Sequence, residues 1–230
     1  MRVRPILVQP MRAPRRNSRD PRTEAKPAEA PAPRAVGEVR IIGGSLKRSK
    51  IKILDRPTLR PTPDRIRETV FNWLAPSIEG ARVLDLCAGT GVLGLEALSR
   101  GAAFAQCNES DAHLARQIAS EATRLKVAER LYVSTRRAEM LLNEPPSSRF
   151  DVVFVDPPFD ADLWARLLFR LPPWLAPSAY VYLEHPRELP VPFGGNWKVH
   201  RHASAGRIEF YLLELDPASL PIPAPASESV

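Results

Sequence analysis

Between residues 81 and 215, short apolar runs of strand composition alternate with runs that have helical spacing. Five runs are predicted strands, over residues 81–86, 103–109, 130–135, 149–156 and 179–185. Four helical runs lie between them, over residues 92–101, 111–127, 136–143 and 160–171. Residues 197–203 and 207–215 follow as a predicted antiparallel pair. This alternation predicts an α/β fold with a doubly wound, mostly parallel seven-stranded sheet, whose ligands bind beyond the carboxyl ends of the strands.

The loop after the first predicted strand carries a nucleotide-binding pattern. Gly89, Gly91 and Gly94 match the spacing GxGxxG, and Glu109 ends the second predicted strand. Glycines let the backbone approach a ligand closely, and a carboxylate in that place can accept hydrogen bonds from both ribose hydroxyls of an adenosine. The pattern therefore predicts a cofactor that contains a nucleoside. The alternative is a tight turn followed by a surface glutamate.

Asp85, at the end of the first predicted strand, indicates the kind of cofactor. The pyrophosphate of a dinucleotide uses the positive start of a helix, and an acid beside it is unfavourable. A carboxylate suits S-adenosylmethionine, which carries a sulfonium and an ammonium group and no phosphate. Two alternatives stay open. Asp85 can hydrogen-bond loop amides instead, and GxGxxG alone also fits a nicotinamide-dependent oxidoreductase.

The fourth predicted strand ends in the motif Asp156-Pro157-Pro158-Phe159. Consecutive prolines fix the backbone and remove amide donors, which leaves rigid carbonyl acceptors beside Asp156. The Asp156 carboxylate and the Pro157 carbonyl together form a clamp for an NH₂ group, and Phe159 offers a face on which a planar base can stack. Such a clamp aims the lone pair of the amine at one point, as in-line methyl transfer requires. These four are the predicted catalytic residues.

The positive charge of the chain lies near its start. Residues 1–37 hold nine Arg or Lys and three acids, and residues 38–70 hold nine and four, in a chain whose net charge is +7. A one-sided basic region predicts a nucleic-acid partner, and tails that only aid solubility are the alternative. The predicted segments are a disordered basic tail, a basic extension, a catalytic domain and a disordered Pro-rich tail, over residues 1–37, 38–74, 75–215 and 216–230.

Apolar run length and cysteine content bear on location. No uninterrupted apolar stretch approaches the ~20 residues of a membrane span. Cys87 and Cys107 cannot form a disulfide framework, so a reducing, cytoplasmic location is expected. Neither cysteine stands in a metal-ligand spacing such as CxxC, and no metal site is expected.

Four segments of the sequence together resemble a known family. The stretches DLCAGTG over residues 85–91 and DPPF over residues 156–159 are similar to amino-methyltransferases that modify exocyclic nitrogens of bases. The stretches RIIGG over residues 40–44 and RPTPDRIRETVFNWL over residues 60–74 resemble the 16S rRNA guanine-N2 methyltransferase family (RsmD type). The resemblance runs from about Val39 to about Leu215.

The resemblance implies a Rossmann-like class I fold, S-adenosylmethionine as methyl donor, and methylation of one guanine N2 in 16S rRNA. The resemblance also suggests a 30S subunit or an assembly intermediate as the substrate. Separately, the enzyme is expected to be a monomer without metal. The implied cofactor site consists of Asp85, Cys87, Ala88, Gly89, Thr90, Gly91, Glu109, Ser110 and Ala138. Arg137 stands where many methyltransferases have an acceptor for the adenine amine, so a backbone group near Ala138 is expected to serve instead. The alternatives are an adenine-N6 methyltransferase acting on DNA and a non-catalytic RNA-binding assembly factor.

The basic extension is predicted to bind the RNA. The residues assigned to this role are Arg40, Lys47, Arg48, Lys50, Arg60, Arg65 and Arg67. They are expected to contact phosphates, so binding should weaken as the salt concentration rises. For Arg65 and Arg67 the alternative is ion pairing with neighbouring acids on the surface of a helix that begins near Pro63.

Overall fold

The computed structural model describes residues 34–57, 59, 61–159 and 162–216. Apart from residues 34–37 and residue 216, the two predicted tails lie outside these residues. These described residues belong to one compact unit. The predicted boundary between the basic extension and the catalytic domain, at residues 74 and 75, falls inside helix α1 (Asp64–Ile78). It does not divide two structural units. In the described ranges every helix is too short or too polar to cross a membrane.

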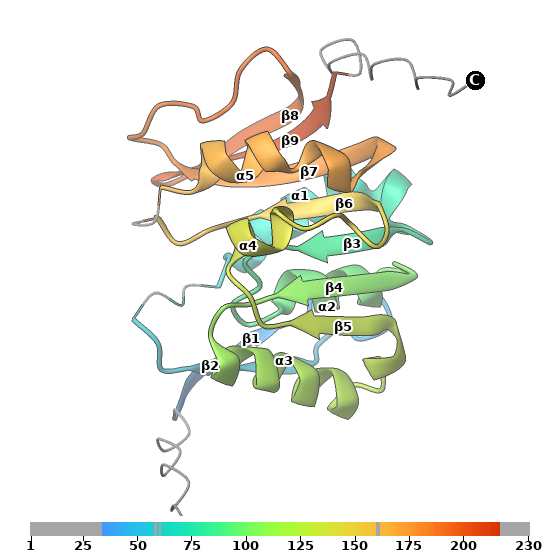
Figure 1. Ribbon diagram of the computed structural model, residues 1–230. Coiled ribbons are helices and arrows are strands. Elements are labelled where there is room, and N and C mark those ends of the chain that lie inside the picture. Colours follow the sequence, from blue (N-terminus) through green and yellow to red (C-terminus); the bar gives the residue numbers. More distant parts are fainter. Residues whose placement is uncertain (1–33, 58, 60, 160–161, 217–230) are drawn as a thin grey trace, which may run out of the picture. The chain divides into compact units, whose positions relative to one another are not determined.

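Within the described residues, seven strands form one sheet in the order β5-β4-β3-β6-β7-β9-β8 (Figure 1). They are β3 (Arg82–Asp85), β4 (Phe104–Asn108), β5 (Leu131–Ser134), β6 (Phe150–Val155), β7 (Leu175–Pro186), β8 (Trp197–Ala205) and β9 (Ile208–Leu215). The pairs from β5 through β7 are parallel, and β9 pairs antiparallel with β7 and β8. The predicted Rossmann-like fold class is confirmed. The chain order reverses at β3, so the loop after β3 lies at the topological switch point.

The apolar runs of the central strands are buried on both faces, which is why they are nearly continuous in the sequence. In β6, Val152 and Phe154 belong to one core cluster and Val153 and Val155 to the other, since successive side chains alternate across a strand. Helices α1, α2 (Val92–Ser99) and α3 (Ala112–Arg124) cover the first cluster. Helices α4 (Ala138–Leu142) and α5 (Trp164–Arg170) cover the second.

Part of the predicted tail and of the basic extension forms a hairpin. Strand β1 (Ala35–Arg40) pairs antiparallel with β2 (Lys50–Leu54) in a separate two-stranded sheet. Since β1 begins at Ala35, the predicted tail of residues 1–37 extends three residues too far. Ile51 is buried whereas its neighbours Lys50 and Lys52 are exposed, so one face of the hairpin packs on the core.

The turn after β1 docks onto α2 through its backbone. The amides of Ile42 and Gly43 donate to the carboxylate of Glu96, each at 2.8 Å. The Ser99 hydroxyl donates to the Gly43 carbonyl at 2.5 Å. At Gly44, φ is 73° and a Cβ would lie 1.8 Å from the Ser99 carbonyl oxygen, so the position requires glycine. The RIIGG segment is therefore the joint between the hairpin and α2.

Candidate active site at the carboxyl ends of the strands

A cavity of about 640 Å³ lies at the carboxyl ends of β3, β4 and β6. Predicted cofactor and catalytic residues border this one cavity, namely Cys87, Ala88, Gly89, Thr90, Glu109, Ser110, Ala138, Asp156, Pro157, Pro158 and Phe159. Two stretches of sequence about 70 residues apart, the Gly-rich loop and the DPPF motif, thus meet at one place, as the rule for open α/β sheets predicts. Asp85 and Gly91 are not among the described residues that line it.

Asp85 lies beneath the loop rather than in the cavity. Its side chain is 1% exposed, and a Cβ at Gly94 would lie 3.9 Å from its Oδ2. Burial raises the pKa of Asp85 to about 7, a shift that hydrogen bonds from the amides of Gly94 and Cys87 oppose. The structure thus does not bring Asp85 to the cavity wall. The amides of Gly94 and Cys87 favour the alternative, in which Asp85 hydrogen-bonds loop amides, but its Oδ2 has no hydrogen-bond partner among the described residues.

Gly91 also acts below the surface of the cavity. It has φ of 75° at the N-cap of α2, and a Cβ there would come within 2.9 Å of Ile118 on α3. Glycine at this position lets α2 begin directly after the loop and lets α3 pack against it. Its role is in the shape of the loop.

Glu109 holds the loop and the start of α3 together from the end of β4. Its Oε2 accepts a hydrogen bond from the Gly89 amide at 2.8 Å. Its Oε1 accepts from the Asp111 amide at 2.8 Å and from the Ser110 hydroxyl at 3.3 Å. A carboxylate has about four acceptor sites, so Glu109 keeps capacity for ribose hydroxyls at the cavity wall that it lines.

Asn108 joins the ends of three strands. Its Nδ2 donates to the carbonyls of Leu86 and Arg136, each at 3.0 Å, and its Oδ1 accepts from the Ser134 hydroxyl at 2.8 Å. The side chain is 1% exposed. Sequence reasoning missed it, although a polar residue inside an otherwise apolar strand is a signal that could have identified it.

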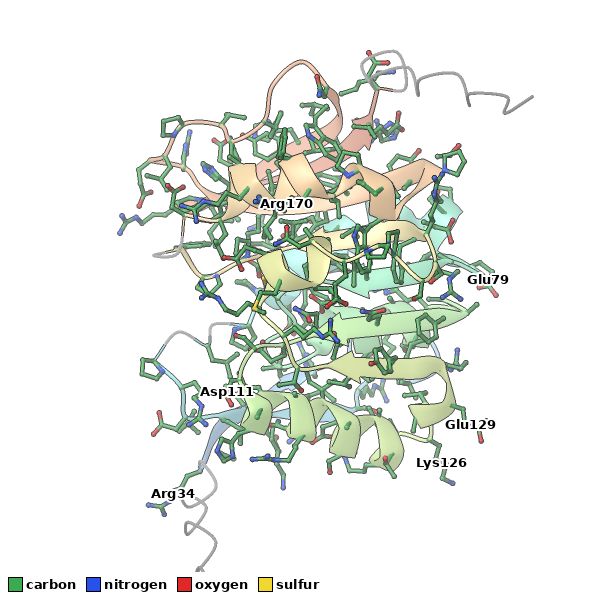
Figure 2. All side chains as sticks on the ribbon, in the orientation of Figure 1. Arg34, Glu79, Asp111, Lys126, Glu129 and Arg170 are labelled. Carbon is green, nitrogen blue, oxygen red and sulfur yellow. The ribbon has the colours of Figure 1, made fainter. Side chains whose placement is uncertain are left out.

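The chain between β2 and α1 forms another wall of the cavity, which includes Arg56, Leu59 and Thr62. Arg56 Nε lies 2.6 Å from Oδ2 of Asp111, the N-cap residue of α3 that is labelled in Figure 2. Burial raises the pKa of Asp111, but the hydrogen bond from Arg56 and those from the first amides of α3 outweigh it, so the pKa is lowered. This ion pair ties the wall to the cofactor side of the site.

Asp156 follows β6 and keeps part of its surface open to the cavity. The Thr62 hydroxyl donates to its Oδ2 at 3.3 Å. Burial first, and then the nearby carboxyls of Glu184 and Asp85, raise the pKa of Asp156 well above its usual range, while the bond from Thr62 lowers it. Phe159 is 39% exposed at the cavity, with its ring 6.1 Å from that of the buried Trp164.

Glu184 is a second acid at the catalytic end of the cavity, and sequence reasoning missed it. It lies in β7, is 4% exposed and lines the cavity. The hydroxyl of Tyr182 donates to its Oε2 at 2.8 Å. Burial raises the pKa of Glu184, and hydrogen bonds from Tyr182 and Thr62 oppose the shift. In the sequence, Glu184 is only a polar residue near the end of a predicted strand, and nothing there indicates its neighbour.

One predicted RNA-binding residue is placed incorrectly by the sequence reasoning. Arg67 is 0% exposed, so its guanidinium cannot reach a phosphate. Its Nε donates to the Thr62 carbonyl at 3.0 Å, and its Nη2 lies 2.6 Å from Asp64. Its Nη1 lies 3.5 Å from the buried carboxylate of Glu96. Pairing with Asp64, the alternative, is present, but inside the protein rather than on the helix surface.

The other basic residues of the extension lie at the surface. Lys47, Arg48 and Arg65 are exposed. Arg40 is exposed and pairs with Asp64 at 2.8 Å, and Lys50 is exposed and pairs with Glu38 at 2.6 Å. Arg60 lies outside the described residues. The exposed cations remain candidates for phosphate contact.

The charges around the cavity favour a cationic ligand. Among the described residues that line it, three are arginines, and each is paired with a carboxylate: Arg56 with Asp111, Arg136 with Glu144 and Arg137 with Glu139. The carboxyl groups of Glu109, Asp156 and Glu184 accept from amides and hydroxyls instead. The site therefore suits a nucleoside that carries positive charge better than one that carries a pyrophosphate.

The chain is similar to known methyltransferases in sequence and in fold. Residues 39–214 match the family model described as Conserved hypothetical protein 95. The protein named Ribosomal RNA small subunit methyltransferase D of Escherichia coli (strain K12) is 40% identical over 181 residues, which is 77% of this chain and 90% of that protein. The solved structure of Escherichia coli yhhF has a TM-score of 0.71 at 38% identity, and the match covers 78% of this chain and 99% of that one. An RNA methyltransferase from Salinibacter ruber, solved with S-adenosyl-L-homocysteine, shares the fold at a TM-score of 0.55 and 21% identity, over 70% of this chain and 97% of that one.

Proposed function

Because this chain belongs to the RsmD-type methyltransferases, the family described as Conserved hypothetical protein 95, we propose that it methylates the exocyclic N2 amine of one guanine in 16S rRNA. S-adenosylmethionine is the proposed methyl donor, and supplies a methyl group on a positively charged sulfur. The E. coli relative is named for the ribosomal RNA of the small subunit, which supports the choice of substrate.

One observation carries the proposal: the Gly-rich loop and the DPPF motif border the same cavity. Glu109 and the loop amides around Gly89 would hold the nucleoside part of the cofactor. The surplus of carboxyl groups not paired with cations suits its sulfonium and ammonium groups. The lining arginines that the structure describes are each paired with a carboxylate, which argues against the pyrophosphate of a nicotinamide cofactor.

Asp156 and Pro157 would act on the amine. The Asp156 carboxylate and the Pro157 carbonyl would each accept a hydrogen bond from one N–H of the N2 amine, which aims the nitrogen lone pair at the methyl group. Bound S-adenosylmethionine would supply the methyl group from its sulfonium, and Asp156 would take the proton that N2 loses as the N–C bond forms. Its raised pKa makes Asp156 a stronger base than an ordinary aspartate. Phe159 stacks on the purine.

The RNA would be held by the exposed cations Arg40, Lys47, Arg48, Lys50 and Arg65. A guanine inside a duplex cannot enter the cavity, so the base must be unpaired or flipped out. The proposed substrate is a 30S subunit or an assembly intermediate, met by a monomeric enzyme in the cytoplasm. Free Cys87 and Cys107 agree with a reducing compartment.

The test is transfer of labelled methyl groups to 30S particles from a strain that lacks the modification, followed by mass mapping of the product. We expect one N2-methylguanine in 16S rRNA, and no transfer by Asp156→Ala even though that variant still gains thermal stability from S-adenosylhomocysteine. Transfer to adenine in DNA but not to 30S would favour the adenine-N6 alternative. Stabilisation by NAD but not by S-adenosylhomocysteine would favour the oxidoreductase.

A further inference from the structure

We propose that Glu184 selects guanine by accepting a hydrogen bond from the N1–H of the base, beside the N2 amine held by Asp156. This inference rests on the proposed function and names the residue that would choose a guanine N2 over an adenine N6. It assigns a recognition role to a residue that no sequence motif identifies.

The sheet register places the two acids side by side. Strands β6 and β7 are parallel, with Phe154 opposite Tyr182 and Val155 opposite Leu183. The next residue after β6 is Asp156 and the next residue in β7 is Glu184, and the two carboxyl groups are close enough for Glu184 to raise the pKa of Asp156. Because side chains alternate along a strand, both acids share the face of Phe154 and Tyr182, which lie in the same core cluster. That face is the one α1 covers, and it is there that Thr62 contacts Asp156.

The surroundings of Glu184 hold it in one position. Its side chain is 4% exposed, and the Tyr182 hydroxyl donates to Oε2 at 2.8 Å. The indole Nε1 of Trp164 donates to the Glu184 carbonyl at 2.7 Å. The ring of Trp164 also lies 6.1 Å from Phe159, the proposed stacking residue. These bonds hold the backbone and the carboxyl group of Glu184, and a fixed acceptor is what recognition of a base edge requires.

The chemistry of the two purines differs at this place. Guanine presents N1–H and the N2 amine as adjacent donors, which match two adjacent carboxyl groups. Adenine presents its N6 amine beside an unprotonated N1, whose lone pair would face an acceptor. A buried site built to hydrogen-bond one group rejects an analogue that lacks the donor, because its own polar atoms then stay unpaired. Glu184 would therefore bind guanine and reject adenine.

The decisive probe is 2-aminopurine, which keeps the amine at position 2 but has no proton on N1. We would reconstitute 30S particles whose 16S rRNA carries either guanine or 2-aminopurine at the methylated position, found by the mass mapping described above. For the wild-type enzyme we expect kcat/KM to be about 100-fold lower with 2-aminopurine. In Glu184→Gln, the carboxamide can donate a hydrogen bond to the unprotonated N1 of 2-aminopurine. The ratio of kcat/KM for guanine to kcat/KM for 2-aminopurine should therefore fall by about tenfold or more.

Tyr180→Phe is the matched control. It removes a hydroxyl from the same strand that bonds Glu214 rather than Glu184, so the ratio of the two kcat/KM values should stay near the wild-type value. Tyr182→Phe removes the hydroxyl that holds Glu184, so it should narrow this ratio in the same direction as Glu184→Gln. A purely structural role for Glu184 would move both rates together and leave the ratio unchanged in Glu184→Gln, which would overturn the inference.

The wild-type enzyme alone also tests the inference, without reliance on the folding of a variant. Equal methylation of guanine and 2-aminopurine would overturn the role of Glu184 while leaving the proposed function intact. Absence of methyl transfer to guanine particles would instead remove the proposed function, and this inference with it.

Discussion

Arg67 Nε donates a hydrogen bond of 3.0 Å to the carbonyl of Thr62, the residue whose hydroxyl contacts Asp156. A fully buried cation thus fixes the backbone of the residue beside the proposed catalytic acid. The same guanidinium lies near Asp64 and Glu96, so it joins the start of α1 to α2. Arg67 is in this sense a positioning residue, and its neighbour Arg65 on the surface provides a natural comparison.

Arg67→Met should lower the free energy of unfolding by about 3 kcal/mol, because it leaves buried acceptors at Glu96 and Thr62 without their cation. Urea denaturation measures the effect. The matched control is Arg65→Met, on the exposed side of the same helix, which should change stability by less than about 0.5 kcal/mol. Equal effects of the two substitutions would contradict the buried role of Arg67.

Thr62→Val should move the acidic limb of the pH–rate profile to higher pH. The Thr62 hydroxyl lowers the pKa of Asp156, so its loss raises that pKa further, and the ionised form needed to accept the amine protons is lost at a higher pH. The methyl-transfer rate at neutral pH should fall about tenfold. Thr69→Val, which removes a hydroxyl on the exposed part of α1, is the control. If the acidic limb of the Thr62→Val profile coincides with that of the wild type, the Thr62 hydroxyl does not affect the pKa of Asp156.

Asp85→Asn should remove part of the pH dependence of stability. The native pKa of about 7 exceeds the ordinary value of 3.8, so between these values the folded state binds more protons than the unfolded state and stability falls as pH rises. In the wild-type protein, the titration of Asp85 alone should lower the free energy of unfolding by about 2 kcal/mol as the pH rises from 5.5 to 7.5. Other titrating groups contribute to both proteins and cancel in the difference. Parallel stability curves for wild type and Asp85→Asn, from urea melts at several pH values, would rule out the raised pKa.

Lys47→Glu should weaken binding to 30S particles and lower the slope of log K against log salt by about 1 or more, as expected for the loss of a phosphate contact. Lys47 is exposed in the turn between β1 and β2. Arg166→Glu makes the same change of charge on α5, the helix that covers the opposite face of the sheet, and should leave the slope unchanged. Filter binding over a range of salt concentrations measures both. The same loss from both variants would indicate only a general effect of net charge.

The fold was largely predictable because each strand or helix shows its own apolar pattern within a few consecutive residues. The seven strands of the sheet and the helices between them follow from local alternation of period. The hairpin was missed although Lys50, Ile51, Lys52 and Ile53 alternate with a period of two, because its high charge favoured a reading as an RNA-binding segment.

The site was predictable only where one stretch of chain carries the information. The loop and the DPPF motif are contiguous, so their residues could be identified. Arg67 could have been recognised as buried, since it precedes Val70 and Phe71 by three and four residues and shares their face of α1. Glu184 could not be paired with Asp156, because their proximity depends on the register of β6 against β7. Such a register is a property of the assembled sheet.

The joint between the hairpin and α2 bears on protein engineering. Glu96 and Ser99 hydrogen-bond the RIIGG turn, and only glycine fits at position 44 because the Ser99 carbonyl lies against it. These partners lie on a helix of about 12 Å, by its rise of 1.5 Å per residue, that begins where the cofactor loop ends. The hairpin is consequently not a portable module. A chimera that transplants it onto another methyltransferase would have to carry α2 as well, and with α2 the geometry of the cofactor loop.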